Sequence, residues 1–181
     1  RVLGQVEFGQ VAVIQSTVGM FAPLASLGLA LTTTKFVAEY RDRSPERAGR
    51  IIALSLCAGA VAGLLMTVAL IALAPMMAAS GFANPDLRKQ LIESSGLLFL
   101  GVIEAVQSGA LTGLEAYSRI AKLNAWGGLV SIPVTVLLAS QYGTSGAIAG
   151  LTASLAISCG LNAWVLQAEC QRRGIRTTLA G

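Results

Sequence analysis

One acidic side chain stands out in the sequence as a candidate for chemistry. Glu104 lies near the middle of a predicted apolar helix, eleven residues after Glu93. At 100° per residue this spacing places both carboxylates on one helix face, which Gln107 and Ser108 continue. An ionised carboxylate inside a membrane is costly unless it is paired or hydrated. The pattern therefore predicts a face that lines an aqueous cavity, with Glu104 in contact with a substrate or a coupling ion.

Another interpretation of Glu104 needs no transport role. A protonated carboxyl group that donates a hydrogen bond to a neighbouring helix would also be stable at this depth. A specific role in proton coupling is a narrower version of the cavity interpretation. Gln15, a polar residue in the first apolar segment, is a further candidate for lining the same cavity.

Other kinds of site chemistry have little support in the sequence. There is no histidine, and Cys57, Cys159 and Cys170 lack the spacing of a metal or redox site. No nucleophile lies beside a base, and no glycine-rich phosphate loop precedes a helix. The net charge of +4 and the pI of about 9.3 come from basic residues at helix ends, unlike a nucleic-acid surface. We therefore expect no catalytic residue, no metal, no cofactor and no nucleic-acid partner.

The distribution of charge indicates which elements position these residues. Charged residues make up 12% of the chain, against about 25% in soluble domains, and mean hydropathy is +0.69. No charged residue occurs in the ranges 8–34, 51–85 and 123–168. A membrane-spanning helix needs about 20 apolar residues. The sequence therefore predicts an all-α, polytopic integral membrane helix bundle.

The charge-free ranges accommodate five membrane spans. The predicted spans are 11–31, 51–74, 91–111, 123–140 and 146–168. Proline and turn residues suggest their limits: a helix begins around Pro45, the second span stops at Pro75, and residues 141–145 form a tight turn. Pro23 and Pro133 are predicted to be fixed bends, with hinges as the alternative. The chain begins without Met, so we expect residues 1–181 to be a piece of a longer transmembrane unit.

The basic residues predict the orientation of the bundle. If the connections alternate sides, ten of the thirteen lysines and arginines fall on one side, in the ranges 35–50, 114–122 and 169–181. Basic residues are retained in the cytoplasm during insertion, so these three ranges are predicted to be cytoplasmic. The ranges 1–10, 76–90 and 141–145 would then lie outside. The 35–50 run could also bind anionic headgroups, but a role in topology explains it more simply.

Small residues form a ridge on the last predicted span. They recur every four residues: Gly146, Gly150, Ser154, Ser158 and Asn162. Such a ridge lets a second helix approach closely. Static packing is the favoured interpretation, and a helix that slides during a conformational cycle is the alternative.

Four sequence stretches, in order along the chain, resemble one family of membrane transporters. They are residues 3–9 (LGQVEFG), 27–29 with 34–38 (LGL and TKFVA), 112–117 (TGLEAY) and 142–150 (YGTSGAIAG). Together they resemble the Wzx-type flippases of O-antigen and exopolysaccharide, in the multidrug/oligosaccharidyl-lipid/polysaccharide exporter superfamily. The resemblance implies that the chain holds helices two to six of the first six-helix lobe of a two-lobe transporter. The first helix and the second lobe would then belong to missing parts of the same chain.

The resemblance also implies a mechanism and a location. Two lobes would alternate access to a central cavity and move an oligosaccharide linked to a polyprenyl pyrophosphate across the bacterial inner membrane. Such a cavity is expected to be cationic, whereas the only charge at mid-membrane here is Glu104. Lys35 is the nearest basic candidate. The alternatives are a cation-coupled multidrug exporter of the same superfamily, a membrane-embedded enzyme of cell-envelope lipid or sugar synthesis, and a passive scaffold subunit.

Overall fold

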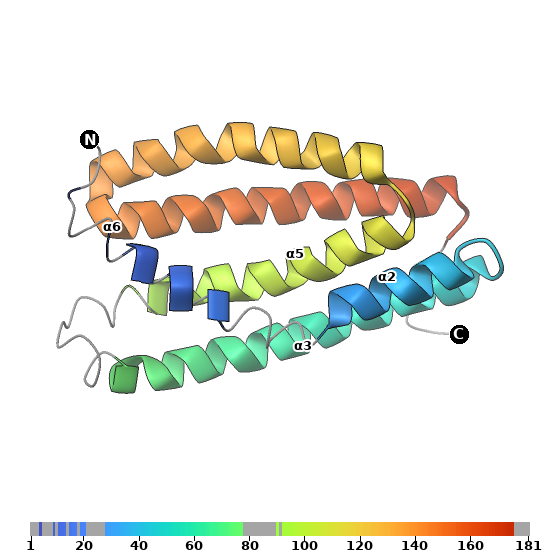
Figure 1. Cartoon of the computed structure of the whole chain (residues 1–181), viewed down its shortest axis with the longest axis horizontal. Helices are drawn as coiled ribbons and strands as arrows, with labels where there is room; N and C mark the ends of the chain where they lie inside the picture. Colours follow the sequence, from blue (N-terminus) through green and yellow to red (C-terminus); the bar gives the residue numbers. More distant parts are fainter. Residues whose placement is uncertain are drawn as a thin grey trace.

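The chain folds as a bundle of helices that run along one common axis (Figure 1). The computed structural model describes residues 28–77, 90 and 92–175, and near the N-terminus residues 4, 9, 11–13, 15–17 and 19–20. The main helices are α2 (Leu29–Tyr40), α3 (Pro45–Met77), α5 (Ser95–Gly113) and α6 (Tyr117–Arg172). Among the described residues, α3, α5 and α6 are long and apolar enough to cross a membrane. The predicted all-α membrane bundle is confirmed.

Helix α6 folds back on itself and crosses the bundle twice. Its 56 residues would extend about 84 Å if straight, far beyond a hydrocarbon core of about 30 Å. Gly143 breaks the helix with φ 59° and ψ −135°, a backbone conformation that glycine adopts readily. Residues 117–142 form the first limb and residues 144–172 the second limb of a hairpin (Figure 1). The reversal falls within the turn predicted at 141–145.

Helix α5 is the centre of the bundle, because it packs against α2, α3 and α6. Two glycines four residues apart bring α2 very close to it. A Cβ atom at Gly109 would lie 2.5 Å from the Ala30 carbonyl oxygen, and one at Gly113 would lie 2.8 Å from the Thr34 carbonyl oxygen. The Thr34 hydroxyl donates a hydrogen bond of 2.9 Å to the Gly109 carbonyl. This contact joins two helices through their backbones, as small residues do inside membranes.

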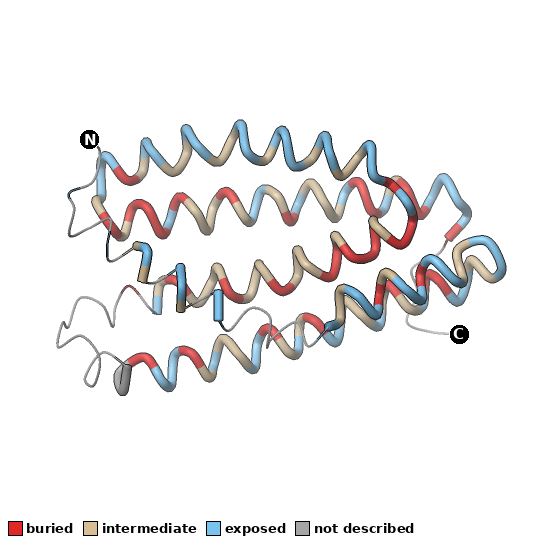
Figure 2. Tube along the Cα trace, in the orientation of Figure 1, coloured by how far each residue is buried: buried red, intermediate tan, exposed pale blue. Residues whose placement is uncertain are grey.

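Three connections lie together at one end of the bundle, which we call the basic end: residues 41–44, 114–116 and 173–175 (Figure 1). Buried side chains from α2, α3, α5 and α6 meet there in one apolar cluster that includes Val37, Ile52, Leu111 and Leu166. Figure 2 shows buried residues concentrated on α5 toward this end, while much of the first limb of α6 is exposed. The helices are therefore held together most tightly at the basic end.

Ion pairs tie the connections of the basic end to one another. Arg41 Nη2 lies 2.8 Å from Glu115 Oε1, and the hydrogen bond with Glu115 raises the pKa of Arg41 above its ordinary value. Arg119 and Arg173 both contact Glu169, at 3.0 and 3.1 Å. Arg41, Arg119 and Arg173, three of the ten predicted cytoplasmic basic residues, thus help to hold the helix ends together.

The turn between α5 and α6 closes on a residue in an uncommon conformation. Glu115 has φ 54°, in the left-handed region where glycine is usual, at a cost of about 1 kcal/mol for an L side chain. The Ala116 amide donates to the Leu111 carbonyl at 3.0 Å, which completes a Schellman end for α5. Glu115 therefore serves both as the helix terminator and as the partner of Arg41.

Several helix boundaries differ from the predicted spans. The charged connection expected at 35–50 is only residues 41–44, because α2 continues to Tyr40. Helix α3 begins at Pro45, where the sequence predicted a helix start. Similarly, α6 begins at Tyr117 and continues to Arg172, within ranges predicted as connection and tail. The reason is that a run of charge marks where a chain leaves the hydrocarbon, whereas the helix itself can continue into water.

Two further boundary differences concern α3 and α5. Helix α3 does not stop at Pro75 but continues to Met77. Proline disturbs the turn that precedes it, by losing its N–H and crowding the carbonyl four residues earlier, whereas the residues after it keep their N–H groups. Helix α5 begins at Ser95, four residues after the predicted start of that span. Pro133 lies inside the helical first limb of α6, and the predicted bend at Pro23 lies outside the described residues.

Candidate functional site

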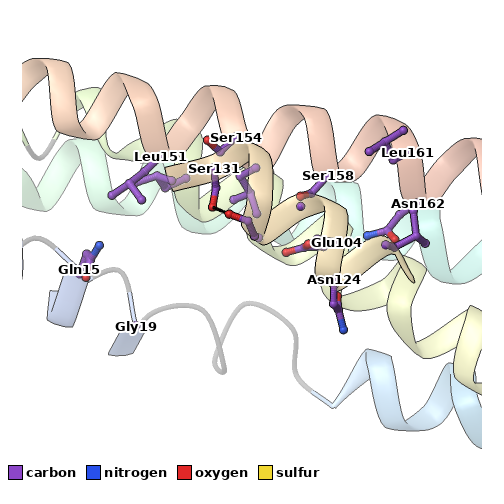
Figure 3. A pocket seen from close by; sticks show the side chains of 16 residues that line it. Gln15, Gly19, Glu104, Asn124, Ser131, Leu151, Ser154, Ser158, Leu161 and Asn162 are labelled. Carbon is purple, nitrogen blue, oxygen red and sulfur yellow. Dashed lines mark hydrogen bonds between the residues drawn. The ribbon is translucent and has the colours of Figure 1, made fainter. Parts of the chain in front are cut away.

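A cavity of about 500 Å³ lies between α5 and the two limbs of α6, and we call it the main cavity (Figure 3). Its walls are leucines and glycines with a small number of polar side chains. The polar residues are Gln15, Glu104, Asn124, Ser131, Ser154, Ser158 and Asn162. An apolar hollow of this size with a few polar groups has the character of a small-molecule site.

Glu104 stands at the centre of the polar part of the main cavity. It projects half-buried from α5, and Figure 3 places it beside Asn124 of the first limb and beside Ser158 and Asn162 of the second. Hydroxyl and amide groups can donate hydrogen bonds to a carboxylate. Within the described part of the chain, no lysine or arginine lines the main cavity. The site is therefore polar and acidic.

A smaller hollow of about 310 Å³, the side cavity, adjoins the main cavity on the α5 side. Glu104, Asn124 and Asn162 line both cavities, and Ser108 lines only the side cavity. Ser108 lies one turn after Glu104 on α5, so the two side chains share a face, as the sequence predicted.

The remaining predicted site residues on α5 and its N-terminal approach lie elsewhere. Glu93 lies before the start of α5 and lines a different hollow beside Tyr142 and Gly146, because it precedes the helix whereas Glu104 lies near the middle of it. Gln107 is only 6% exposed and lines neither cavity, since three residues turn it about 60° away from Glu104. Its Oε1 atom is buried without a hydrogen-bond partner among the described residues. The single polar stripe expected on this helix is therefore wrong.

Lys35, the basic candidate, does not reach either cavity. Its side chain is exposed on α2, and its ammonium group lies 5.6 Å from the centre of the Phe36 ring. Gln15, in contrast, lines the edge of the main cavity together with Gly19 (Figure 3).

The ridge of small residues on the second limb divides into two parts. Gly146 and Gly150 pack directly on the first limb, and a Cβ atom at Gly150 would lie 2.7 Å from the Thr135 Cα. Ser154, Ser158 and Asn162 line the main cavity instead. Close packing at one end of the ridge thus fixes how the limbs diverge around the cavity at the other.

Sequence reasoning missed the contribution of the first limb. Asn124 and Ser131 line the main cavity. Gly127 leaves room there for Ser158, because a Cβ atom at Gly127 would lie only 3.2 Å from the Ser158 Oγ. The available signal was an asparagine inside an otherwise apolar span. The pair Gly109 and Gly113 on α5 was also missed, although its spacing of four is visible in the sequence.

The site contains no metal centre in the part of the chain that the structure describes, where no three His, Cys, Asp or Glu side chains are grouped to hold an ion. Cys159 contributes to packing: its thiol donates to the Leu100 carbonyl at 3.3 Å and joins the second limb to α5. The chemistry available in the cavities is hydrogen bonding and charge, without an evident covalent nucleophile.

The fold and the cavities together define a multi-pass helical membrane protein with a group of polar side chains in a hollow between its helices. The chain belongs to the polysaccharide biosynthesis protein family, which matches residues 1–168. The match covers α2, α3, α5 and nearly all of α6, and therefore every residue that lines the main cavity. No curated protein and no solved structure matches the chain significantly.

Proposed function

We propose that this chain is part of the first lobe of a flippase, which moves lipid-linked oligosaccharide across the bacterial inner membrane by alternating access. The observation that carries the proposal is the main cavity, a largely apolar hollow of about 500 Å³ between membrane helices, with a cluster of polar side chains around Glu104. Membership of the polysaccharide biosynthesis protein family supports a sugar as the cargo. The family and the chemistry of the cavity both favour a transporter over an enzyme.

The composition of the main cavity suits sugar hydroxyl groups. Each sugar hydroxyl both donates and accepts a hydrogen bond, and the cavity offers a carboxylate acceptor at Glu104 with amides that do both at Asn124 and Asn162. Leucine and glycine walls can contact the apolar faces of sugar rings. We infer that this lobe holds the oligosaccharide part of the substrate.

The pyrophosphate of such a substrate needs positive charge that the main cavity lacks. A phosphate placed beside an ionised Glu104 would be repelled, and no lysine or arginine among the described residues lines the cavity. We propose that the second lobe of the complete transporter supplies the cations. The lobes would then divide the substrate between them, with the sugar on this side.

The orientation proposed for the lobe puts the basic end in the cytoplasm. The connections 41–44, 114–116 and 173–175 lie at one end of the bundle, with Arg41, Arg119 and Arg173. Retention of basic residues during insertion supports this assignment. The hairpin turn at Gly143 would then lie on the outer side of the membrane.

A second candidate function is a cation-coupled exporter, and the absence of a basic partner for Glu104 among the described residues supports it. No ion pair joins the Glu104 carboxylate to a basic residue in the described part of the chain. A proton or a sodium ion could therefore neutralise it during transport. In that case transport would depend on pH or sodium, and replacement of Glu104 would abolish this dependence.

The decisive experiment replaces Glu104 by glutamine. In the complete transporter, loss of one charged hydrogen-bonding partner, about 1.5–3 kcal/mol, should lower flipping of a fluorescent lipid-linked oligosaccharide in proteoliposomes by about tenfold or more. Glu93→Gln is the matched control, because it makes the same change in a different hollow. Abundance in the membrane should stay normal for both variants.

Two results would contradict the proposal. Undiminished flipping by Glu104→Gln would show that the carboxylate does not touch the substrate. A Glu104→Gln protein that vanishes from the membrane, while Glu93→Gln persists, would show that the residue is structural.

A further inference from the structure

A separate hollow of about 710 Å³ opens between the two limbs of α6 near the basic end. Two facing stripes of side chains form it. The first limb provides Arg119, Lys122 and Trp126, and the second limb provides Trp164, Ala168 and Arg172. We call this hollow the tryptophan groove. Of the described residues, only the apolar Leu123 and Leu161 line both this groove and the main cavity.

The tryptophan groove carries two cations that are free to bind an anion. Arg119 is engaged by Glu169, whose Oε2 lies 3.0 Å from its guanidinium. Lys122 and Arg172 form no ion pair with any residue that the structure describes, and both are exposed. The groove therefore carries the positive charge of Lys122 and Arg172, which no residue in the described part of the chain neutralises.

The order of residues along the limbs gives the groove a polar and an apolar end. The first limb starts at Tyr117 and the second ends at Arg172, so Lys122 and Arg172 lie nearest to the basic end. Trp126 and Trp164 lie deeper and are 62% and 68% exposed. Val130 and Leu161 continue the wall beyond the indole rings. Tryptophan is enriched at the headgroup level of membranes, with apolar residues on its hydrocarbon side.

This arrangement matches the two parts of a membrane phospholipid. We propose that the tryptophan groove binds an anionic glycerophospholipid of the leaflet at the basic end, with its phosphate between Lys122 and Arg172 and an acyl chain beside the two indole rings. The bilayer supplies such lipids in large excess over any lipid-linked sugar, so mass action fills an open groove with them. The site is independent of the proposed transport substrate.

The indole rings themselves supply the test, because Trp126 and Trp164 are the only two tryptophans in the chain. The chain is reconstituted in nanodiscs of phosphatidylcholine with a rising fraction of phosphatidylglycerol, one of the two lipids carrying brominated acyl chains. Bromine quenches tryptophan fluorescence on contact. Brominated phosphatidylglycerol should quench at a lower mole fraction than brominated phosphatidylcholine.

The variant Lys122→Gln with Arg172→Gln should remove this preference. Each basic residue near the surface favours an anionic lipid by about fivefold. Each single variant should therefore show a preference for phosphatidylglycerol about fivefold weaker than that of the unaltered chain, and the double variant should show almost no preference. Arg43→Gln with Arg50→Gln is the matched control, because these exposed residues lie outside the groove at the same end of the bundle. The control should keep the preference of the unaltered chain.

Three outcomes would overturn the proposal. The preference could survive in the groove variant, or fall equally in the control, and either result would assign it to general surface charge. In a third experiment, undecaprenyl phosphate is added at a small mole fraction to nanodiscs that contain brominated phosphatidylglycerol. Relief of quenching there, where unbrominated phosphatidylglycerol at the same fraction has no effect, would assign the groove to a polyprenyl carrier.

Discussion

Replacing Gly109 by alanine tests whether backbone contact between α2 and α5 holds the bundle together. The added Cβ would lie 2.5 Å from the Ala30 carbonyl oxygen, whereas carbon and oxygen normally approach to about 3.3 Å. The helices must therefore separate by about 0.8 Å. Separation weakens the 2.9 Å hydrogen bond from Thr34 to the Gly109 carbonyl, worth about 0.6 kcal/mol inside a membrane. Overpacking adds about 1–3 kcal/mol.

Gly101→Ala is the matched control on the same helix, because no atom of the described residues lies within 4 Å of a Cβ at that position. Both substitutions gain the same helix propensity, about 1 kcal/mol, so the difference between them isolates the contact with α2. Gly109→Ala should be about 2–4 kcal/mol less stable than Gly101→Ala. The free energy of unfolding is measured by titrating the protein in mild detergent with dodecyl sulfate. Equal stability of the two variants, within about 0.5 kcal/mol, would refute the close contact.

Three further predictions concern the basic end. Glu115→Gly should be about 1 kcal/mol more stable than Glu115→Ala in the same titration, because both lose the ion pair with Arg41 and only glycine relieves the positive φ; equal stability would argue against strain there. A cysteine introduced at Ser44 should resist an impermeant thiol reagent in intact cells and react after lysis, and labelling in intact cells would reverse the proposed orientation. Burial, with the charge of Glu169, raises the pKa of Cys170 to about 11, so its thiolate fraction at pH 8 is about a hundredfold below that of a thiol with the ordinary value of 9.0. In a variant whose other cysteines are serine, alkylation of Cys170 should therefore speed up about tenfold per pH unit toward pH 10, and a rate that levels off near pH 9 would contradict the burial.

The helices could be predicted because a membrane leaves a chain few options. Backbone groups in hydrocarbon must be satisfied within the segment, so a long charge-free range such as 123–168 must be helical, and one too long for a single crossing must turn back. Helix ends were harder to predict. Lys35 and Arg119 lie inside helices, because charge reports depth in the membrane and says little about where the backbone stops being helical.

Only the part of the candidate site on α5, which carries the charged residue Glu104, could be predicted from the sequence. Glu104 draws attention because a carboxylate at mid-membrane needs solvation. Its neighbours Asn124 and Asn162 lie 20 and 58 residues away in sequence, and their meeting depends on the register of the hairpin at Gly143. The spacing of glycines in the sequence likewise does not show which glycines contact another helix. The pair Gly109 and Gly113 meets a helix, but only the tertiary arrangement shows which of several such pairs does so.

The position of α5 has a mechanical consequence for the helix bundle. Helices α2, α3 and α5 contact one another, with the backbone contact at Gly109 locking one seam, so they form a stiff block of three helices. The hairpin of α6 packs against this block mainly through α5, and its most extensive buried contacts are at the basic end. A tilt of the hairpin about that end would widen or narrow the space around Glu104 without disturbing any seam inside the block. The bundle is thus divided into a block of three helices and a hairpin that contacts this block mainly through α5.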